Sequence, residues 1–262
     1  FVNGSSTAAV LDGASSIDGL SDGYNDGSSV GLGTDALLND DGTANKTTAV
    51  GTNALRLNTS GYSNVAIGHS TLGSNTTGYK NTAIGTEVMS NNTTGVGSIA
   101  IGYWALRSNI TGGGNIAIGN YSLYYNTTGY DNVATGLDAL YDNTTGHSNT
   151  ATGSGASRYN TTGVQNTATG YYALRNNIGS LNTAIGYKAL SGNYSGTKNI
   201  GIGYTAGDGI STGSNNTVIG DLAGTAAMTS TVLLGAGSTE RLKVDSTGLY
   251  VNGSSTALAG GA

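Results

Sequence analysis

The chain has 262 residues, of which 45 are glycine, none is proline or cysteine, and only 10% are charged. Without cysteine it has neither a disulfide framework nor a thiolate metal site. A net charge of −5, with ten scattered Lys and Arg residues, offers no basic stripe for phosphate, so we expect no nucleic-acid partner. No apolar run approaches the ~20 residues that span a bilayer, and we expect no membrane insertion. The chain is also poor in the Pro, Glu and Lys of disordered proteins, which indicates an ordered, repetitive fold.

Residues 1–28 are expected to form a connector. Because the chain begins at Phe1 rather than Met, we expect a fragment or a processed form. Aspartates lie among glycines here and beside the first repeat, at Asp18, Asp22, Asp26, Asp40 and Asp41. Their spacing departs from an EF-hand loop, which also ends in a bidentate Glu. Turn formation explains them more simply than calcium, so we predict no metal and no cofactor.

Residues 29–231 contain twelve copies of one repeat of about 17 residues, called rungs here, with positions numbered 1 to 17. Residues 64–80, for example, read NVAIGHSTLGSNTTGYK, and the register holds without a gap from residue 64 to residue 165. The length is too short for a helix-pair repeat of ~34 residues or a leucine-rich repeat of ~20–29. Each rung reads as strand, bend, strand and turn. The sequence therefore predicts an all-β fold, a parallel β-solenoid or β-roll of about twelve 17-residue rungs.

Small residues occupy three columns of the repeat. Position 5 is glycine in every rung, and position 15 is glycine in most. We expect both columns to mark corners that need positive φ or close backbone approach. Position 3 is mostly alanine, as at Ala66, Ala83 and Ala100. Its smallness implies close packing against another backbone, and a second chain is one candidate for it.

Each rung has three further side chains that could form a core: a β-branched residue at position 2, Ile or Thr at position 4 and Leu or Met at position 9. One thin coil of this kind buries little apolar surface. Slender solenoids gain a core by winding with identical chains about a common axis. We therefore predict an intertwined homotrimeric fibre.

Position 12 begins an N-x-Ser/Thr triplet in seven rungs, at Asn58, Asn75, Asn92, Asn109, Asn126, Asn143 and Asn160. Such triplets are glycosylation acceptors in secreted eukaryotic proteins. The strict spacing favours a ladder of turns instead, in which Asn adopts αL geometry or bonds to the local backbone. The threonine pairs that follow, such as Thr76 and Thr77, form a row that raises ice binding as an alternative function.

Residues 232–262 are expected to form a β-rich closing element and a linker to the next module. The string VNGSSTA occurs at residues 2–8 and again at residues 251–257. If that spacing is a module length, the joint recurs at each end. Adjoining fibre modules are then partners of this chain.

Two sets of strings carry a resemblance to known families. NTAIG and NVAIG, with their glycine and alanine columns, resemble the head repeats of YadA-type trimeric autotransporter adhesins, although those repeats are usually shorter. The longer rung, the segment DGYNDGSSVGLG at 22–33 and the ending ERLKVDSTGLYV at 240–251 more closely resemble phage tail-fibre proteins. The resemblance implies a trimeric fibre with a receptor-binding or spacer role, and it carries over no catalytic residue.

Residues for catalysis are scarce, and we expect no enzyme activity. His69 lies beside Ser70 without a positioned carboxylate, and His147 is more than four rungs away. The acidic residues inside the regular rungs are Glu87, Asp131, Asp138 and Asp142. A glycosidase needs two carboxyls ~5–9.5 Å apart in a cleft, and a narrow rod favours surface solubility for these residues instead.

Aromatic residues are the best candidates for ligand contact, because they fall in variable columns. Those in rungs 98–148 are Tyr103, Trp104, Tyr121, Tyr124, Tyr125 and Tyr141. If exposed, they form a ridge that stacks on sugar rings and donates hydrogen bonds. Packing between subunits of the trimer is the alternative.

The sequence thus predicts a structural, receptor-binding segment of an extracellular trimeric tail fibre that attaches to a glycan or protein of a host surface. A bacterial trimeric adhesin or other extracellular fibre is the alternative, and an ice-binding solenoid is a more remote one.

Overall fold

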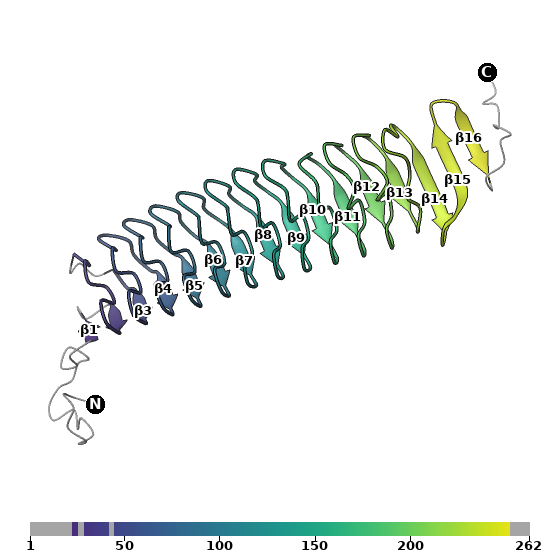
Figure 1. Cartoon of the computed structure of the whole chain (residues 1–262). Helices are drawn as coiled ribbons and strands as arrows, with labels where there is room; N and C mark the ends of the chain where they lie inside the picture. The colour runs from purple at the N-terminus through teal and green to yellow at the C-terminus, as the bar shows by residue number, and fades with distance from the viewer. Residues whose placement is uncertain (1–22, 26–28, 42–44, 252–262) are drawn as a thin grey trace. The chain divides into compact units, whose positions relative to one another are not determined.

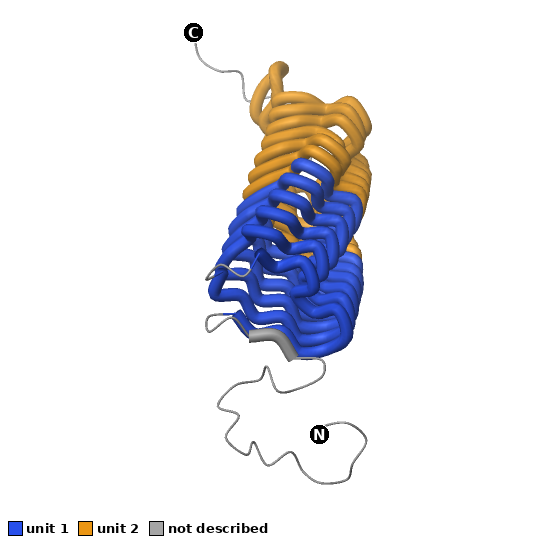
Figure 2. The backbone as a smooth tube through the Cα atoms, turned by 90° about the vertical axis from the view of Figure 1, so that its left-hand side faces the viewer, with its two compact units in different colours: residues 1–128 blue, residues 129–262 orange. Residues whose placement is uncertain are grey.

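A computed structural model describes residues 23–25, 29–41 and 45–251 (Figure 1). Most of the expected connector and the repeated VNGSSTA string therefore lie outside the described residues. All regular structure in the described part is β, and it contains no helix that could cross a membrane. The chain divides into two compact units, one ending at Thr128 and one starting at Gly129 (Figure 2).

Each rung contributes one three-residue strand from positions 2–4. The second strand predicted in each rung is wrong, because the segment around position 9 is a run of turns, as at residues 69–74. The strands of the first unit are β1 (Gly23–Asn25), β2 (Val30–Leu32), β3 (Thr48–Val50), β4 (Val65–Ile67), β5 (Thr82–Ile84), β6 (Ile99–Ile101) and β7 (Ile116–Ile118). Those of the second unit are β8 (Val133–Thr135), β9 (Thr150–Thr152), β10 (Thr167–Thr169), β11 (Thr183–Ile185), β12 (Ile200–Ile202), β13 (Thr217–Ile219), β14 (Val232–Ala236), β15 (Thr239–Asp245) and β16 (Gly248–Val251).

Within each unit, equivalent positions pair across successive rungs in parallel. Ala66 of β4 lies opposite Ala83 of β5, and Ala151 of β9 lies opposite Ala168 of β10. The same register relates the other rung strands β2–β7 and β8–β13 of each unit. The predicted parallel β-solenoid of about twelve rungs is confirmed.

Antiparallel pairing also occurs in each unit. β1 pairs antiparallel with β2, with Tyr24 opposite Gly31. In the second unit β14 adds in parallel to β13, and β15 and β16 then fold back as antiparallel strands (Figure 1). Residues 232–251 thus form a β-meander that ends the parallel stacking.

Leucine and alanine columns fill the interior of each coil. Leu72, Met89 and Leu106 at position 9 are fully buried, as are the alanines of position 3. Gly201 shows how close the two columns lie, because a Cβ built there is 2.7 Å from Leu190 Cγ. The expectation that the small column packs on a second chain is therefore wrong. Position 3 is small because the leucines of the same chain occupy the space opposite it.

Two asparagine ladders run through the interior beside this apolar core. At position 12, Asn75 Nδ2 donates to Asn58 Oδ1 (2.8 Å) and to Gly78 O (3.0 Å). At position 1, Asn64 Oδ1 accepts from the backbone N–H of Asn81 (3.0 Å), one rung away. The asparagines of both columns are buried, and each satisfies backbone groups that the thin coil leaves unpaired. The predicted ladder at position 12 is confirmed, with the amides inside the coil rather than at its surface.

The two glycine columns are corners for different reasons. Gly85 at position 5 has φ +135°, and a Cβ there would lie 2.2 Å from Gly102 O of the next rung. Gly78 at position 15 lacks a positive φ, but a Cβ would lie 2.3 Å from Asn75 Oδ1. The first column therefore needs both conformational freedom and space, and the second needs only space.

Left-handed backbone occurs at positions 7, 9 and 17 rather than at the turn asparagines. Ser70 (φ 52°), Leu72 (φ 52°) and Lys80 (φ 57°) are one rung's examples. Such residues cost of order 1 kcal/mol each and persist only where the surroundings hold them. Here the ladder bonds of the adjacent rungs hold the backbone, as with Leu72 N–H to Val88 O (3.0 Å).

One rung interrupts the leucine column with a serine, Ser157. Its side chain is 1% exposed, and its Oγ has no hydrogen-bond partner. Replacing it with alanine removes a buried unpaired hydroxyl, and we expect the free energy of unfolding to rise by about 1 kcal/mol. Thermal unfolding of Ser157→Ala tests this. Ser148→Ala is the control, because Ser148 has a similar φ of 56° but is exposed, and no gain is expected there.

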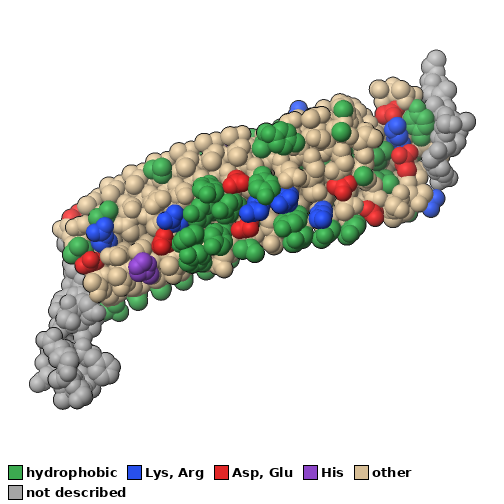
Figure 3. Space-filling model, in the orientation of Figure 1, with side chains coloured by type: hydrophobic (Ala, Val, Ile, Leu, Met, Phe, Trp, Pro, Cys, Tyr) green, Lys and Arg blue, Asp and Glu red, His purple; other side chains and the backbone are tan. Residues whose placement is uncertain are grey.

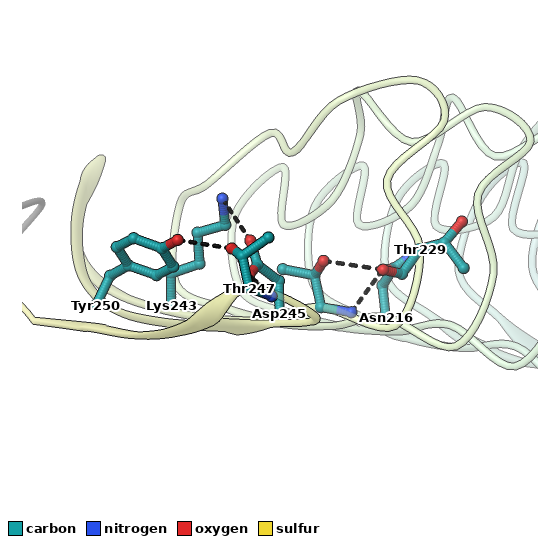
Figure 4. A network of polar contacts seen from close by, with 7 residues as sticks. Asn216, Thr229, Lys243, Asp245, Thr247 and Tyr250 are labelled. Atoms are coloured by element: carbon teal, nitrogen blue, oxygen red, sulfur yellow. Dashed lines mark hydrogen bonds and ion pairs between the residues drawn. The ribbon is translucent and has the colours of Figure 1, made fainter. Parts of the chain in front are cut away.

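A polar network closes the turn between β15 and β16 (Figure 4). Asp245 Oδ1 accepts the Thr247 N–H (2.8 Å), and Lys243 Nζ lies 2.9 Å from Asp245 Oδ2. The hydrogen bonds from Thr247, followed by those from Lys243, lower the pKa of the Asp245 carboxyl. Because the pKa of Asp245 is lower in the folded protein, its ionised carboxylate stabilises the fold above the unfolded-state pKa. This stabilisation is lost as the pH falls through the folded-state pKa. The turn is therefore held by an ionised carboxylate at neutral pH.

Candidate attachment and assembly surfaces

The outward face of the sheet carries exposed apolar side chains in each unit. Positions 2 and 4 flank the buried alanine and point away from the interior. Eight of the ten isoleucines at these positions are 37–43% exposed: Ile67, Ile99, Ile101 and Ile118 in the first unit, and Ile185, Ile200, Ile202 and Ile219 in the second. Every rung from 29 to 231 has Val, Ile, Leu or Thr at both positions. Each unit thus presents two uncharged columns on the outside of its sheet.

Five of the six predicted contact residues gather in the first unit, in the two rungs that contain β6 and β7. Tyr103 stacks on Trp104, with ring centroids 4.5 Å apart. Tyr121 meets both rings edge-on at 5.6 Å. Tyr124 lies 5.8 Å from Trp104 and Tyr125 lies 4.6 Å from Tyr124. We call these five residues the aromatic cluster.

The aromatic cluster is a packed group rather than a row of free ring faces. Tyr124 is 9% exposed and forms its buried part, whereas Tyr103 (39%) and Tyr125 (45%) form its exposed edge. Partial desolvation, followed by the neighbouring Tyr121, raises the pKa of Tyr103. Its hydroxyl is therefore a neutral donor at physiological pH.

Arg107 connects the aromatic cluster to an acidic residue. Its guanidinium lies over the Trp104 ring at 5.0 Å, and its Nη1 donates to the Tyr124 hydroxyl (3.2 Å). Its Nε lies 3.0 Å from Glu87 Oε2. Figure 3 shows apolar side chains gathered on one face with charged groups beside them. Tyrosine, tryptophan and arginine side chains are enriched at protein recognition surfaces.

The sixth predicted residue, Tyr141, belongs to the second unit. The Arg158 guanidinium lies over its ring at 5.2 Å, and Arg158 also forms an ion pair with Asp138 (3.5 Å). Burial raises the pKa of the nearby Asp142, against the opposing effect of Arg158. The predicted surface acids Glu87 and Asp138 are thus both members of ion pairs with arginine.

A row of exposed tyrosines in the second unit was missed by the sequence analysis. Tyr171 and Tyr187 stack at 5.4 Å, and Tyr187 and Tyr204 stack at 5.0 Å. All three occupy position 6 of successive rungs, so alignment by position would have found them. Because the rings stack on one another, the row presents mainly edges and hydroxyls.

The histidines and threonines take part in local contacts. His69 Nε2 lies 3.5 Å from the Oγ of its neighbour Ser70, and the His147 ring stacks on Tyr130 at 4.5 Å. Thr76 Oγ1 donates to Thr93 O of the next rung (3.1 Å). The proton of the Thr76 hydroxyl is therefore engaged within the chain, whereas an ice-binding threonine row would need such hydroxyls to contact water. Among the described residues, no three His, Cys, Asp or Glu side chains gather to hold a metal.

Comparison with known protein families, curated proteins and solved structures found no match to this chain. The class is therefore defined by the fold itself. The chain is a parallel β-solenoid repeat protein with buried asparagine ladders and an uncharged outward sheet face.

Proposed function

We propose that this chain is a structural segment of an extracellular homotrimeric fibre, of the phage tail-fibre type, that attaches to a host surface. A bacterial trimeric adhesin is the nearest alternative within the same class. The observation that supports self-assembly is the outward sheet face. Contiguous exposed apolar surface of this kind marks an interaction site in soluble proteins.

The energetics of the outward face favour copies of this chain as its partner. Each exposed isoleucine keeps roughly 40% of its surface in water, and burying the remainder contributes on the order of 1 kcal/mol. The four such residues of each unit together contribute on the order of 4 kcal/mol per chain, which is comparable to the lower estimates of the cost of association. No rung from 29 to 231 has a charge at positions 2 or 4, so identical faces meet without repulsion.

Attachment follows from the same assembly. Three chains with repeated rungs present each weak contact several times, and multivalency converts weak contacts into avidity. The resemblance to trimeric fibres supports the number three. The exposed edge of the aromatic cluster, Tyr103 and Tyr125, supplies rings that are suited to sugars.

The solution mass of the chain tests the assembly. We expect light scattering to give three times the chain mass of 26.0 kDa. Ile101→Lys places a charge on the outward face in every subunit, and we expect at least ~10-fold weaker trimer formation. Ile110→Lys is the matched control, because Ile110 is 44% exposed but lies at position 13, away from that face. A stable monomer, or equal effects of the two substitutions, would contradict the proposal.

A second candidate, ice binding, is favoured by one observation. β9 and β10 present threonines at both outward positions: Thr150, Thr152, Thr167 and Thr169. A flat two-column threonine face can order water, and in this arrangement it lies on the sheet rather than in the turn. A monomer with measurable thermal hysteresis would favour this function over the fibre.

A further inference from the structure

We propose that a polar hollow in the first unit, next to the aromatic cluster, binds an acidic saccharide through Arg56. This inference rests on the proposed attachment role and names the class of ligand. The hollow has a volume of about 390 Å³, within the ~300–1,000 Å³ typical of small-molecule sites.

The hollow exists because the repeat places small residues between large ones. Position 10 reads Arg56, Gly73, Ser90 and Arg107 in four successive rungs. The small glycine and serine side chains leave an open space, and one arginine lies at each end of it. Rungs stack at ~4.8 Å, so the two arginine positions are on the order of 14 Å apart along the coil. That length suits a short linear ligand that lies across the rungs.

The walls of the hollow offer hydrogen bonds rather than apolar contact. Ser70, Ser74 and Ser90 provide hydroxyls, and Asn53 and Asn91 provide amides. The Ser90 hydroxyl is buried and has no hydrogen-bond partner, so Ser70 and Ser74 supply the accessible hydroxyls. Hydroxyls and amides of this kind match the ring hydroxyls of a sugar. The aromatic cluster at the Arg107 end adds an apolar platform for a sugar face.

Charge at the hollow favours an anion. Glu87, the acidic residue of the lining, is neutralised by Arg107 at 3.0 Å. Arg56 is exposed and has no ion-pair partner among the described residues. A guanidinium binds carboxylate and sulfate groups in a two-pronged geometry. The one uncompensated charge of the hollow is therefore positive, in a chain whose net charge of −5 repels polyanions elsewhere.

Binding of defined polysaccharides to the full chain tests the inference. The probes are polygalacturonate, which is carboxylated, heparin, which is sulfated, and dextran, which is uncharged. We expect at least one acidic probe to bind and dextran not to bind. Arg56→Gln is expected to weaken that binding about 10- to 100-fold, by loss of a charge-assisted hydrogen bond.

Two further variants separate the hollow from general charge effects. Ser74→Tyr fills the hollow and should abolish binding. Tyrosine fits that column, because Tyr125 and Tyr159 occupy position 11 in other rungs. Lys80→Gln removes the same charge outside the hollow, and we expect less than a ~2-fold change there.

Each outcome decides between the inference and the function on which it rests. If acidic probes bind equally well to the Arg56→Gln and Ser74→Tyr variants, the hollow is not their site and the inference is overturned. Equal binding of dextran would also overturn it, while attachment to glycans would stand. If neither the probes nor intact cells of any tested host bind the chain, the attachment role fails as well.

Discussion

Replacing Asn92 with alanine is expected to lower the free energy of unfolding by about 2–4 kcal/mol. The Asn92 side chain is fully buried. Its Nδ2 donates to Asn75 Oδ1 (2.9 Å), and its Oδ1 accepts from Asn109 Nδ2 (2.7 Å). With alanine at this position, Asn75 Oδ1 and Asn109 Nδ2 would each lose their buried hydrogen bond to residue 92. Each lost bond costs about 1–3 kcal/mol. The Gly95 carbonyl would still accept from Asn81 Nδ2 (2.8 Å), which limits the loss.

The neighbouring residue provides the control for this experiment. Asn91 is exposed at position 11, and its side chain takes no part in the ladder. Asn91→Ala should change the free energy of unfolding by no more than ~0.5 kcal/mol. Urea unfolding of the two variants measures the difference. Equal stabilities would mean that the asparagine ladder fills space without stabilising the stack.

Replacing Gly85 with alanine is expected to cost at least ~3 kcal/mol, through two separate effects. The φ of +135° is strained for any residue with a side chain, at ~1–3 kcal/mol. The added Cβ would also lie 2.2 Å from the Gly102 carbonyl of the next rung. That oxygen belongs to the backbone, so relief requires the two rungs to separate and to lose ladder hydrogen bonds.

Gly97→Ala separates these two effects. Gly97 has a φ of +64°, and nothing lies within 4 Å of a Cβ built on it. Other rungs have Lys80 and Asp131 at this position with φ of 57° and 53°. We expect a cost of only ~1 kcal/mol from the left-handed backbone. Unfolding midpoints of the two variants should differ clearly, and similar midpoints would show that rung contact at position 5 is not limiting.

The period of the sequence determined the architecture. Because each rung contacts only its neighbours, equivalent positions stack on one another, and the glycine column at position 5 marks the register in the sequence. For the same reason the asparagines of position 12 had to form a ladder. The presence of aromatic residues in adjacent rungs likewise located the aromatic cluster, since consecutive rungs are neighbours in space.

The direction of each side chain was decided by the tertiary structure. Alternation in a strand such as Val65-Ala66-Ile67 places either the alanine or its two neighbours inside, and the sequence is compatible with both. The structure turns the alanine inward, because Leu72 and its equivalents already fill the narrow interior. The larger residues are left outside.

The hollow beside the aromatic cluster likewise depended on structure. Arg56 and Ser74 are ordinary residues in the sequence, and only the stacking of their columns gives them a shared surface. The sequence by itself determined which residues are equivalent, because hydrogen bonding between rungs enforces one repeat length. Which side of the backbone each column occupies was decided only by the folded coil, because that choice depends on the volume left inside it.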